Sequence, residues 1–216
     1  MLSQNEQAAF DQSSANVRAR AFHHLRVVRD VSAAVGFVSN LHDAVDKAGM
    51  EVNERGPAME CRAGCSHCCS VRVEATDAEI YRIAREVGKR PADEAHKLLG
   101  RLEDRVSAGD YGIESPRRSP CAFLEKDLCS IYAVRPAVCR KAHSLSVRSC
   151  LDSAREIPQN MEMLLVADAL IQGISDAYRE AALPSSAHEL CKSVLAVLRD
   201  PGLEASWFGG ESVLPG

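Results

Sequence analysis

The chain has 216 residues, of which 46% are hydrophobic and 26% charged, and its formal net charge is −4. A chain of this length folds as one large domain or two small ones and buries enough surface for a conventional core. The slight negative charge excludes a general attraction to nucleic acid or anionic membranes. No apolar stretch reaches the ~18 residues of a membrane span, and the N-terminus lacks the pattern of a secretory signal. We therefore expect a cytoplasmic protein with no membrane partner.

Apolar residues recur at helical spacing in the N-terminal segment. Successive members of the stripe are three, four, three and seven positions apart, and they are Val28, Val31, Val35, Val38 and Val45. This pattern predicts a long helix or a helical pair over 14–48, within an N-terminal helical arm of residues 1–50. Two roles for the arm stay open, a homo-oligomer contact through the helix and packing on the chain's own core.

The middle of the chain combines a short strand with two helices. Val71 and Val73 alternate with polar residues, as in a strand. Thr76 and Glu79 then form a capping box, which predicts the start of a helix. A second helix is expected over 93–108. Beyond it, the stretch CAFLEKDLCSIY, which begins at residue 121, predicts a small hairpin with its turn at Glu-Lys-Asp.

Two more helices are expected near the C-terminus, as a helical hairpin over residues 156–200. The first spans 160–182, and a box formed by Ser186 and Glu189 caps the second. The last segment, 201–216, is rich in Gly and Pro and is expected to be mobile. It holds the single tryptophan, Trp207, which either docks on a partner or packs on its own domain.

Together these patterns predict a mainly α fold. Helices flank a loop-and-hairpin, cysteine-rich, metal-binding region at residues 51–155. The N-terminal arm, the C-terminal hairpin and the tail complete the expected organisation.

Eight of the nine cysteines fall within this central region, and they are the candidate metal ligands: Cys61, Cys65, Cys68, Cys69, Cys121, Cys129, Cys139 and Cys150. A cytoplasmic location keeps thiols reduced and argues against a disulfide framework. Zinc takes four thiolates in a closed tetrahedron, and iron–sulfur clusters also take four cysteines. Eight cysteines therefore fill one or two such sites with zinc or iron, and an iron–sulfur cluster is one of the forms considered.

Two of these cysteines are neighbours in the sequence. Side chains of adjacent residues usually point in different directions, so Cys68 and Cys69 are not expected to bind one metal ion together. We infer either two nearby sites or one site with a spare thiol. The neighbouring His67 is assigned a supporting or exposed position, and Cys191 is assigned to the core as a buried thiol.

Positive charge accumulates around the later cysteines. Residues 115–150 contain seven basic and two acidic residues, although the whole chain is negative. Such cations offset the charge of metal-bound thiolates, or they form a face for phosphate or nucleic acid. Aromatic residues are not interleaved with the basic ones. We therefore favour charge compensation and do not expect nucleic acid as a partner.

The spacing of Cys61, Cys65 and Cys68 also matches the cluster loop of radical SAM enzymes. Those enzymes are similar to partial or full (β/α) barrels, which need alternating strands and helices after the loop. The sequence lacks this alternation, which argues against that class.

The combined cysteine pattern resembles the YkgJ-type cysteine-cluster family, described as a zinc- or iron-chelating domain. The resemblance covers residues 61–150 and lies in Cys61-x3-Cys65-x2-Cys68-Cys69, Cys121-Ala-Phe-Leu, Cys129-Ser-Ile-Tyr and Arg135-Pro136-x2-Cys139-Arg140. It implies binding of a metal or an iron–sulfur centre. Larger relatives that share a cysteine cluster include flagellin lysine methylases, but the chain is short for that role and shows no methyl-donor site.

Three hypotheses for the function follow. The first is a metal-binding protein that holds zinc or iron through the cysteine cluster. The second is a redox or group-transfer enzyme with an iron–sulfur centre. The third is a zinc-stabilised module that binds a protein or nucleic acid through the N-terminal helix or the Trp207 segment. The sequence does not decide whether the protein is an enzyme.

Overall fold

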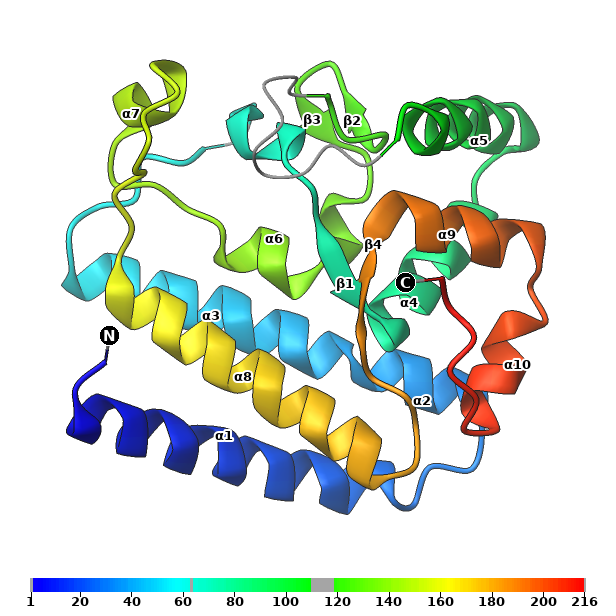
Figure 1. The fold of residues 1–216 in the computed structure, drawn as a ribbon, viewed down its shortest axis with the longest axis horizontal. Helices are drawn as coiled ribbons and strands as arrows, with labels where there is room; N and C mark the ends of the chain where they lie inside the picture. Colours follow the sequence, from blue (N-terminus) through cyan, green and yellow to red (C-terminus); the bar gives the residue numbers. More distant parts are fainter. Residues whose placement is uncertain (1, 63, 110–118, 216) are drawn as a thin grey trace.

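The computed structural model describes residues 2–62, 64–109 and 119–215. It confirms the mainly α fold, with helices around a cysteine-rich region of loops and short elements (Figure 1). The α-helices are α1 (Gln4–Leu25), α2 (Val31–Phe37), α3 (Ser39–Arg55), α4 (Asp77–Gly88), α5 (Ala92–Ser107), α6 (Ala137–Lys141), α7 (Val147–Leu151), α8 (Met161–Glu180), α9 (Leu190–Arg199) and α10 (Leu203–Phe208). Between them lie the 3-10 helices η1 (His67–Ser70) and η2 (Tyr132–Val134) and the strands β1 (Glu74–Thr76), β2 (Leu124–Glu125), β3 (Leu128–Cys129) and β4 (Ala187–Glu189).

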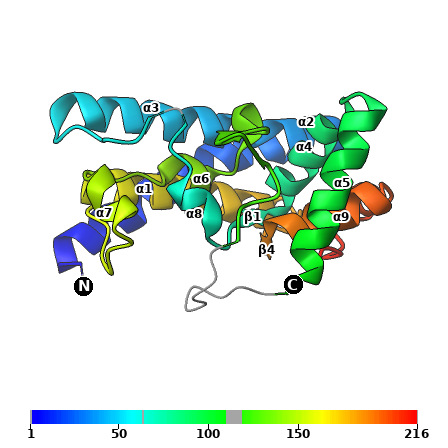
Figure 2. The ribbon, with the colours of Figure 1, turned by 90° about the horizontal axis from the view of Figure 1, so that it is seen from above.

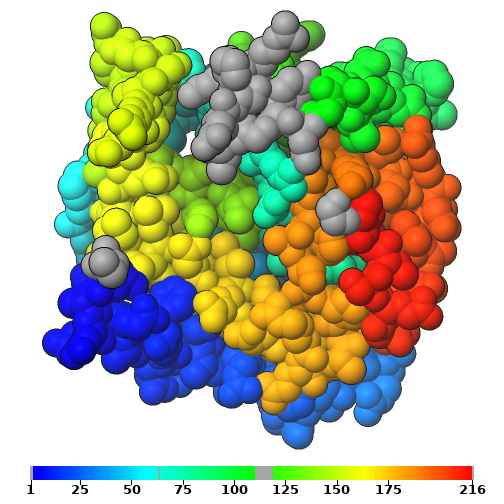
Figure 3. Space-filling model, viewed as in Figure 1, coloured from blue at the N-terminus to red at the C-terminus, as the bar shows by residue number. Residues whose placement is uncertain are grey.

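The long helices α1, α8 and α3 form the base of the molecule. Helix α1 packs along α8, and α8 also packs on α3 (Figures 1 and 3). The contact between α1 and α8 is close at Gly173, where an added Cβ would lie 2.6 Å from the carbonyl oxygen of Ser14 and 2.7 Å from the Cβ of Val17. The first helix therefore packs on the core of its own chain, and glycine permits its close approach to α8.

The valine stripe falls on a helical pair except for Val28, which lies in the loop between α1 and α2. Helix α2 ends at Phe37 and α3 begins at Ser39, and the two lie in line along one edge of the molecule (Figure 2). Val35, Val38 and Val45 are at most 1% exposed. The helical region expected over 14–48 is thus divided among α1, α2 and α3, with a loop between α1 and α2.

The second half of the core is built around α4. Helix α9 packs on α4 and α5, whereas α8 packs on α1 and α3, so the helices of the expected hairpin over 156–200 contact different parts of the molecule. The predicted capping box at Thr76 and Glu79 is confirmed. Burial of one helical face against another is the main source of helix stability in such a core.

The prediction of a Ser186/Glu189 capping box is wrong. Residues Ala187–Glu189 form β4, which pairs antiparallel with β1, so that Ala75 lies opposite His188. Glu189 instead caps α9 itself, because its carboxylate accepts a 2.6 Å hydrogen bond from the backbone N–H of Lys192. The extended backbone that β1 requires of its partner replaces the expected turn of helix.

The predicted hairpin is confirmed as β2 and β3, with Leu124 opposite Cys129. Its turn residues, Lys126 and Asp127, have φ angles of 50° and 62°. Two successive left-handed residues are typical of the tight turns that join twisted strands.

The C-terminal segment 201–216, expected to be mobile, contains α10. Trp207 on this helix is 0% exposed and lies 5.1 Å from the ring of Tyr81 and 6.2 Å from that of Tyr178, measured between ring centroids. Its indole N–H donates a 2.8 Å hydrogen bond to the carbonyl of Pro184. Aromatic packing and a satisfied indole hold this segment on the core.

Across the described residues, no helix combines the length and the apolar character needed to cross a membrane.

Candidate metal centre

The eight candidate ligands lie on loops and short elements, in the part of the molecule that Figure 1 shows above α3 and α8. They are distributed as follows: Cys61 and Cys65 in the loop after α3, Cys68 and Cys69 on η1, Cys121 before β2, Cys129 on β3, Cys139 on α6, and Cys150 on α7. Segments up to 90 positions apart must therefore be held together by contacts outside regular secondary structure.

The loop that carries Cys61 is attached to the segment ahead of α7. The backbone N–H of Glu60 donates a 3.0 Å hydrogen bond to the carbonyl of Ser144, and the N–H of Ser144 donates to the Cys61 sulfur at 3.2 Å. The Glu60 carboxylate accepts a 2.5 Å hydrogen bond from the N–H of Val147, the first residue of α7. These contacts bring Cys61 to the helix that carries Cys150.

A second set of contacts joins η1 to the β2–β3 hairpin. The N–H of Cys121 donates a 2.7 Å hydrogen bond to the carbonyl of Cys69. The hydroxyl of Ser66 donates to the carboxylate of Asp127, in the hairpin turn, at 2.9 Å. The sequence-adjacent pair Cys68 and Cys69 thus lies beside the cysteines of the hairpin.

Cys139 is positioned by the buried carboxylate of Glu79. This carboxylate accepts a 2.7 Å hydrogen bond from the N–H of Ala137, at the start of α6, and lies 3.0 Å from Nε2 of His42. Burial alone would raise the pKa of Glu79, but the hydrogen bond and charge of His42 and the backbone donors lower it overall. The ionised carboxylate fixes the helix that carries Cys139.

Four thiols form an outer group, defined as Cys61, Cys65, Cys68 and Cys150. Partial burial, followed by the charges of the other three sulfurs, raises the pKa of Cys61, while the N–H of Ser144 lowers it. Cys61 and Cys68 are exposed. The influence of the other three sulfurs on Cys61 places them near it, in a region where solvent reaches Cys61 and Cys68.

The other four thiols form an inner group, defined as Cys69, Cys121, Cys129 and Cys139. Burial raises the pKa of Cys129 and of Cys139, and the sulfurs of Cys121 and of Cys68, from the neighbouring outer group, raise both further. Each thiol of this group is partly buried. The raised pKa values mean that burial disfavours the charged thiolates. A metal ion that replaced the protons of these thiols would offset that penalty, because metals bind the thiolate form.

Cys68 and Cys69 lie where the two groups meet. The Cys69 thiol donates a hydrogen bond to the Cys68 sulfur, which lowers the pKa of Cys68 to about 6 and raises that of Cys69. The two thiols thus influence each other, and the expectation that they do not bind one metal ion together stays a prediction. The tight 3-10 turn of η1 permits this contact. Cys68 is the thiol best suited to be ionised at neutral pH.

The donor set suits zinc or iron, because thiolates are the soft ligands that these metals take in proteins. Within the part of the chain that the structure describes, no three His, Cys, Asp or Glu side chains are already arranged to hold an ion. The sulfurs are gathered into neighbourhoods, and ligation would require them to move closer together.

Comparison with known protein families agrees with this chemistry. Residues 60–162 match the CxxCxxCC family, whose model is described as a "putative zinc- or iron-chelating domain". These residues, just under half of the chain, are similar to the CxxCxxCC domain. No curated protein and no solved structure matches the chain. The resemblance inferred from the cysteine spacing is therefore confirmed, and the matched segment contains all eight candidate ligands.

One basic residue of the CxxCxxCC domain acts on the thiols directly. The charge of Arg135 lowers the pKa of Cys68 and opposes the rise at Cys129. Its guanidinium lies 3.7 Å from the ring centroid of Tyr132, which holds it in place. The sequence predicted that the basic residues of 115–150 together offset the charge of the thiolates. In the structure, Arg135 supplies this positive charge.

Other basic residues of the segment are engaged elsewhere. Arg140 pairs with Asp46, Lys141 pairs with Asp168, and Arg148 lies 2.7 Å from Asp152. Arg117 and Arg118 lie outside the described residues.

Cys191 lies beyond the CxxCxxCC domain, yet the structure brings it to the inner group. Its thiol is 3% exposed, lies in the first turn of α9, and donates a hydrogen bond to the Cys121 sulfur. The sequence assigned Cys191 to the core, and its burial agrees. Its contact with Cys121 depends on how α9 packs, so no local spacing could have revealed it.

The imidazole ring of His143 contacts backbone groups of the loop in which it lies. Its Nδ1 lies 2.8 Å from the carbonyl of Lys141, and its Nε2 accepts a 2.7 Å hydrogen bond from the N–H of Asn160. Both ring nitrogens have partners, so this histidine supports the loop between α6 and α8.

Proposed function

We propose that the protein holds zinc or iron, as an ion or as an iron–sulfur centre, through the eight cysteines of its CxxCxxCC domain. The observation that carries the proposal is the convergence of thiols from separate segments on one region, inside a domain matched to a chelating family. The helices around them provide a frame, and the cysteines lie on the loops that the frame presents.

The arrangement favours two sites. The outer group and the inner group each contain four sulfurs, the number that one zinc ion or one iron–sulfur cluster takes. Cys68 would complete the outer site and Cys69 the inner one, so neighbouring residues would serve different metals. Bound metal would supply either structural cross-linking or, as an iron–sulfur centre, electron transfer.

Exposure distinguishes the two sites in function. Two outer thiols, Cys61 and Cys68, are exposed, whereas every inner thiol is partly buried. An exposed iron–sulfur centre is accessible to an electron donor or a substrate. A redox role is therefore the second candidate function, and it belongs to the outer group.

Metal analysis of protein purified without oxygen tests the proposal. Expected results are zinc or iron bound in stoichiometric amount, with visible absorption and acid-labile sulfide if the centre is an iron–sulfur cluster. Protein that stays folded with neither metal after purification, and that takes up neither on reconstitution, would contradict the proposal.

Single cysteine variants test the division into two sites. Cys150→Ser should lose the outer metal and keep the inner one, while Cys129→Ser should do the reverse. Cys191→Ser is the matched control, because it makes the same chemical change outside the eight ligands and should keep both metals. If Cys150→Ser and Cys129→Ser each remove all of the metal, the chain holds one shared site.

A further inference from the structure

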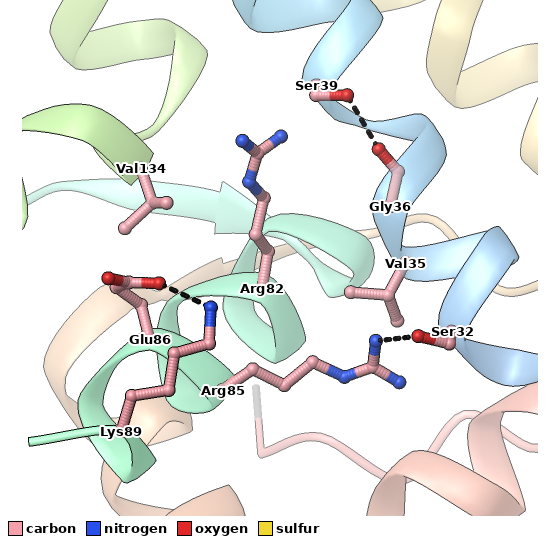
Figure 4. Close-up of a pocket in the computed structure, with 9 residues that line it drawn as sticks. All are labelled: Ser32, Val35, Gly36, Ser39, Arg82, Arg85, Glu86, Lys89 and Val134. Carbon is pink, nitrogen blue, oxygen red and sulfur yellow. Dashed lines mark hydrogen bonds and ion pairs between the residues drawn. The ribbon is translucent and has the colours of Figure 1, made fainter.

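A pocket of about 340 Å³ lies between α2, α4 and η2, and none of the cysteines lines it (Figure 4). Three cations on one face of α4 line it, Arg82, Arg85 and Lys89, whereas Glu86 is the acid among its lining residues. The spacing of three and four residues places the cations on successive turns of the helix.

Two of these cations have anionic partners within the protein. The guanidinium of Arg85 lies 2.7 Å from the carboxylate of Glu204 and donates to the hydroxyl of Ser32 at 2.9 Å. The ammonium of Lys89 donates to the carboxylate of Glu86 at 2.8 Å. Their charges are therefore largely balanced.

Arg82 differs from its neighbours. Its Nη1 is buried and has no hydrogen-bond partner among the residues that the structure describes. Figure 4 shows its side chain extending from α4 into the space between Val134 and the Gly36–Ser39 segment, with no interaction drawn to it. A buried guanidinium nitrogen that lacks a partner is costly, so native proteins rarely leave one without a ligand or water.

Among the residues that the structure describes, no ion pair joins Arg82 to a carboxylate, and its Nη1 has no partner. The nearby Arg140 shares the single carboxylate of Asp46 with Arg135, whose guanidinium lies 3.5 Å from it. Among these three arginines and Asp46, positive charge exceeds negative charge. An anion that entered the pocket would correct this excess.

We propose that this pocket binds a small oxyanion, a carboxylate or phosphate group of a small molecule, with the guanidinium of Arg82 as its main partner. The planar fork of arginine pairs with two oxygens of either group. The hydroxyl of Ser39, on the opposite wall, already donates a 2.8 Å hydrogen bond to the carbonyl of Gly36, so Arg82 is the donor on which the proposal rests (Figure 4). The volume is at the lower end of the range for ligand pockets, which suits a small metabolite.

The pocket lies partly within the metal-binding domain, because α4 and η2 fall inside residues 60–162. Val134, in η2, lines it, and η2 lies between Cys129 on β3 and Cys139 on α6. An occupant would therefore contact the segment that joins two thiols of the inner group. The proposal itself rests on Arg82 and the pocket, and it does not depend on which metal the cysteines hold.

Calorimetric titration of the purified full chain with inorganic phosphate and, separately, with succinate tests the proposal. At least one probe should bind saturably, and the one that binds identifies the class of oxyanion. Arg82→Gln should weaken this binding at least tenfold, and Arg82→Lys, which keeps the charge and loses the fork, should give an intermediate affinity.

Arg55→Gln is the matched control, since Arg55 is an exposed arginine paired with Glu162 far from the pocket. It removes the same charge and should leave the affinity unchanged. Circular dichroism establishes whether each variant is folded. If Arg82→Gln does not fold, the comparison between Arg82→Lys and wild type tests the proposal. Absence of binding by both probes, or equal affinity in folded Arg82 variants and wild type, would overturn the proposal.

Discussion

The carboxylate of Glu79 on α4 accepts a 2.7 Å hydrogen bond from the backbone N–H of Ala137, two residues before Cys139. The same carboxylate lies 3.0 Å from Nε2 of His42 on α3. Both side chains of this pair are at most 3% exposed. One ionised group therefore joins α3 and α4 to the short helix that carries an inner thiol.

Replacing Glu79 by Gln should destabilise the protein strongly. The variant removes the buried carboxylate that binds His42, Ala137 and Thr76, and breaking such a buried, hydrogen-bonded charge network costs about 3–5 kcal/mol. Urea unfolding measures the change. The control is Glu51→Gln, a surface carboxylate 3.8 Å from Lys47, which should change stability by less than about 0.5 kcal/mol. Equal effects of the two substitutions would contradict the assigned role of Glu79.

Two glycines inside helices should respond to alanine in opposite directions. At Gly173 a Cβ would meet the Ser14 carbonyl at 2.6 Å, so Gly173→Ala should push α1 from α8 and cost about 1–3 kcal/mol. At Gly100, on α5, no atom lies within 4 Å of the added Cβ. Gly100→Ala should therefore stabilise the helix by about 0.5–1 kcal/mol. Thermal unfolding of both variants checks the signs, and stabilisation by Gly173→Ala would contradict the observed packing.

The pair His188 and Asp77 should make stability depend on pH. Nε2 of His188 lies 3.3 Å from the Asp77 carboxylate and Nδ1 lies 3.2 Å from the carbonyl of Pro215, so both nitrogens face acceptors. The contact with Asp77 raises the pKa of His188. The pKa of His188 is higher in the folded protein than its value of about 6.5 in the unfolded chain, so protonation of His188 stabilises the folded state below that pH. This stabilisation is lost as the pH rises through the folded-state pKa.

The difference in unfolding free energy between wild type and His188→Gln should accordingly shrink from about pH 6 to pH 9. Urea unfolding across that range measures it. His96→Gln removes an exposed histidine on α5 and serves as the control, with a small difference at every pH. A difference for His188→Gln that grows with pH would have the wrong sign and would exclude a protonated His188.

Cys191 should control the reactivity of Cys121 in metal-free protein. Its thiol donates a hydrogen bond that lowers the pKa of Cys121. Cys191→Ala removes the donor, so Cys121 should be less ionised and alkylate more slowly at neutral pH. Cys191→Ser keeps a donor and should alkylate at nearly the wild-type rate. Peptide mass spectrometry resolves the site of alkylation, and identical rates for Ala and Ser would show that the hydrogen bond has no effect.

Local patterns predicted much of the helical framework. The capping box at Thr76 and Glu79 and the hairpin before Ser130 depend on neighbouring residues, and both are present. Strand β4 could not be predicted in this way, because three residues adopt the extended form only through pairing with β1, more than 100 positions earlier.

At the cysteine site, too, local sequence patterns predicted some features, whereas others depend on the packing of distant segments. Spacing indicated which thiols belong to the CxxCxxCC domain, because the pattern is local. Their partition into outer and inner groups, and the contact of Cys191 with Cys121, depend on how distant segments pack. Glu79 illustrates the difference within one residue, since its bond to Thr76 follows from the sequence and its bonds to His42 and Ala137 do not.

The burial of Trp207 gives the molecule an optical reporter of its own folding. It is the single tryptophan of the chain, and its ring is enclosed between Tyr81 of α4 and Tyr178 of α8. Light absorbed by either tyrosine can pass to the indole, whose emission is sensitive to the polarity around it. The fluorescence of the unmodified protein therefore follows one event, the packing of its last helix against two tyrosines that are 97 positions apart in the sequence.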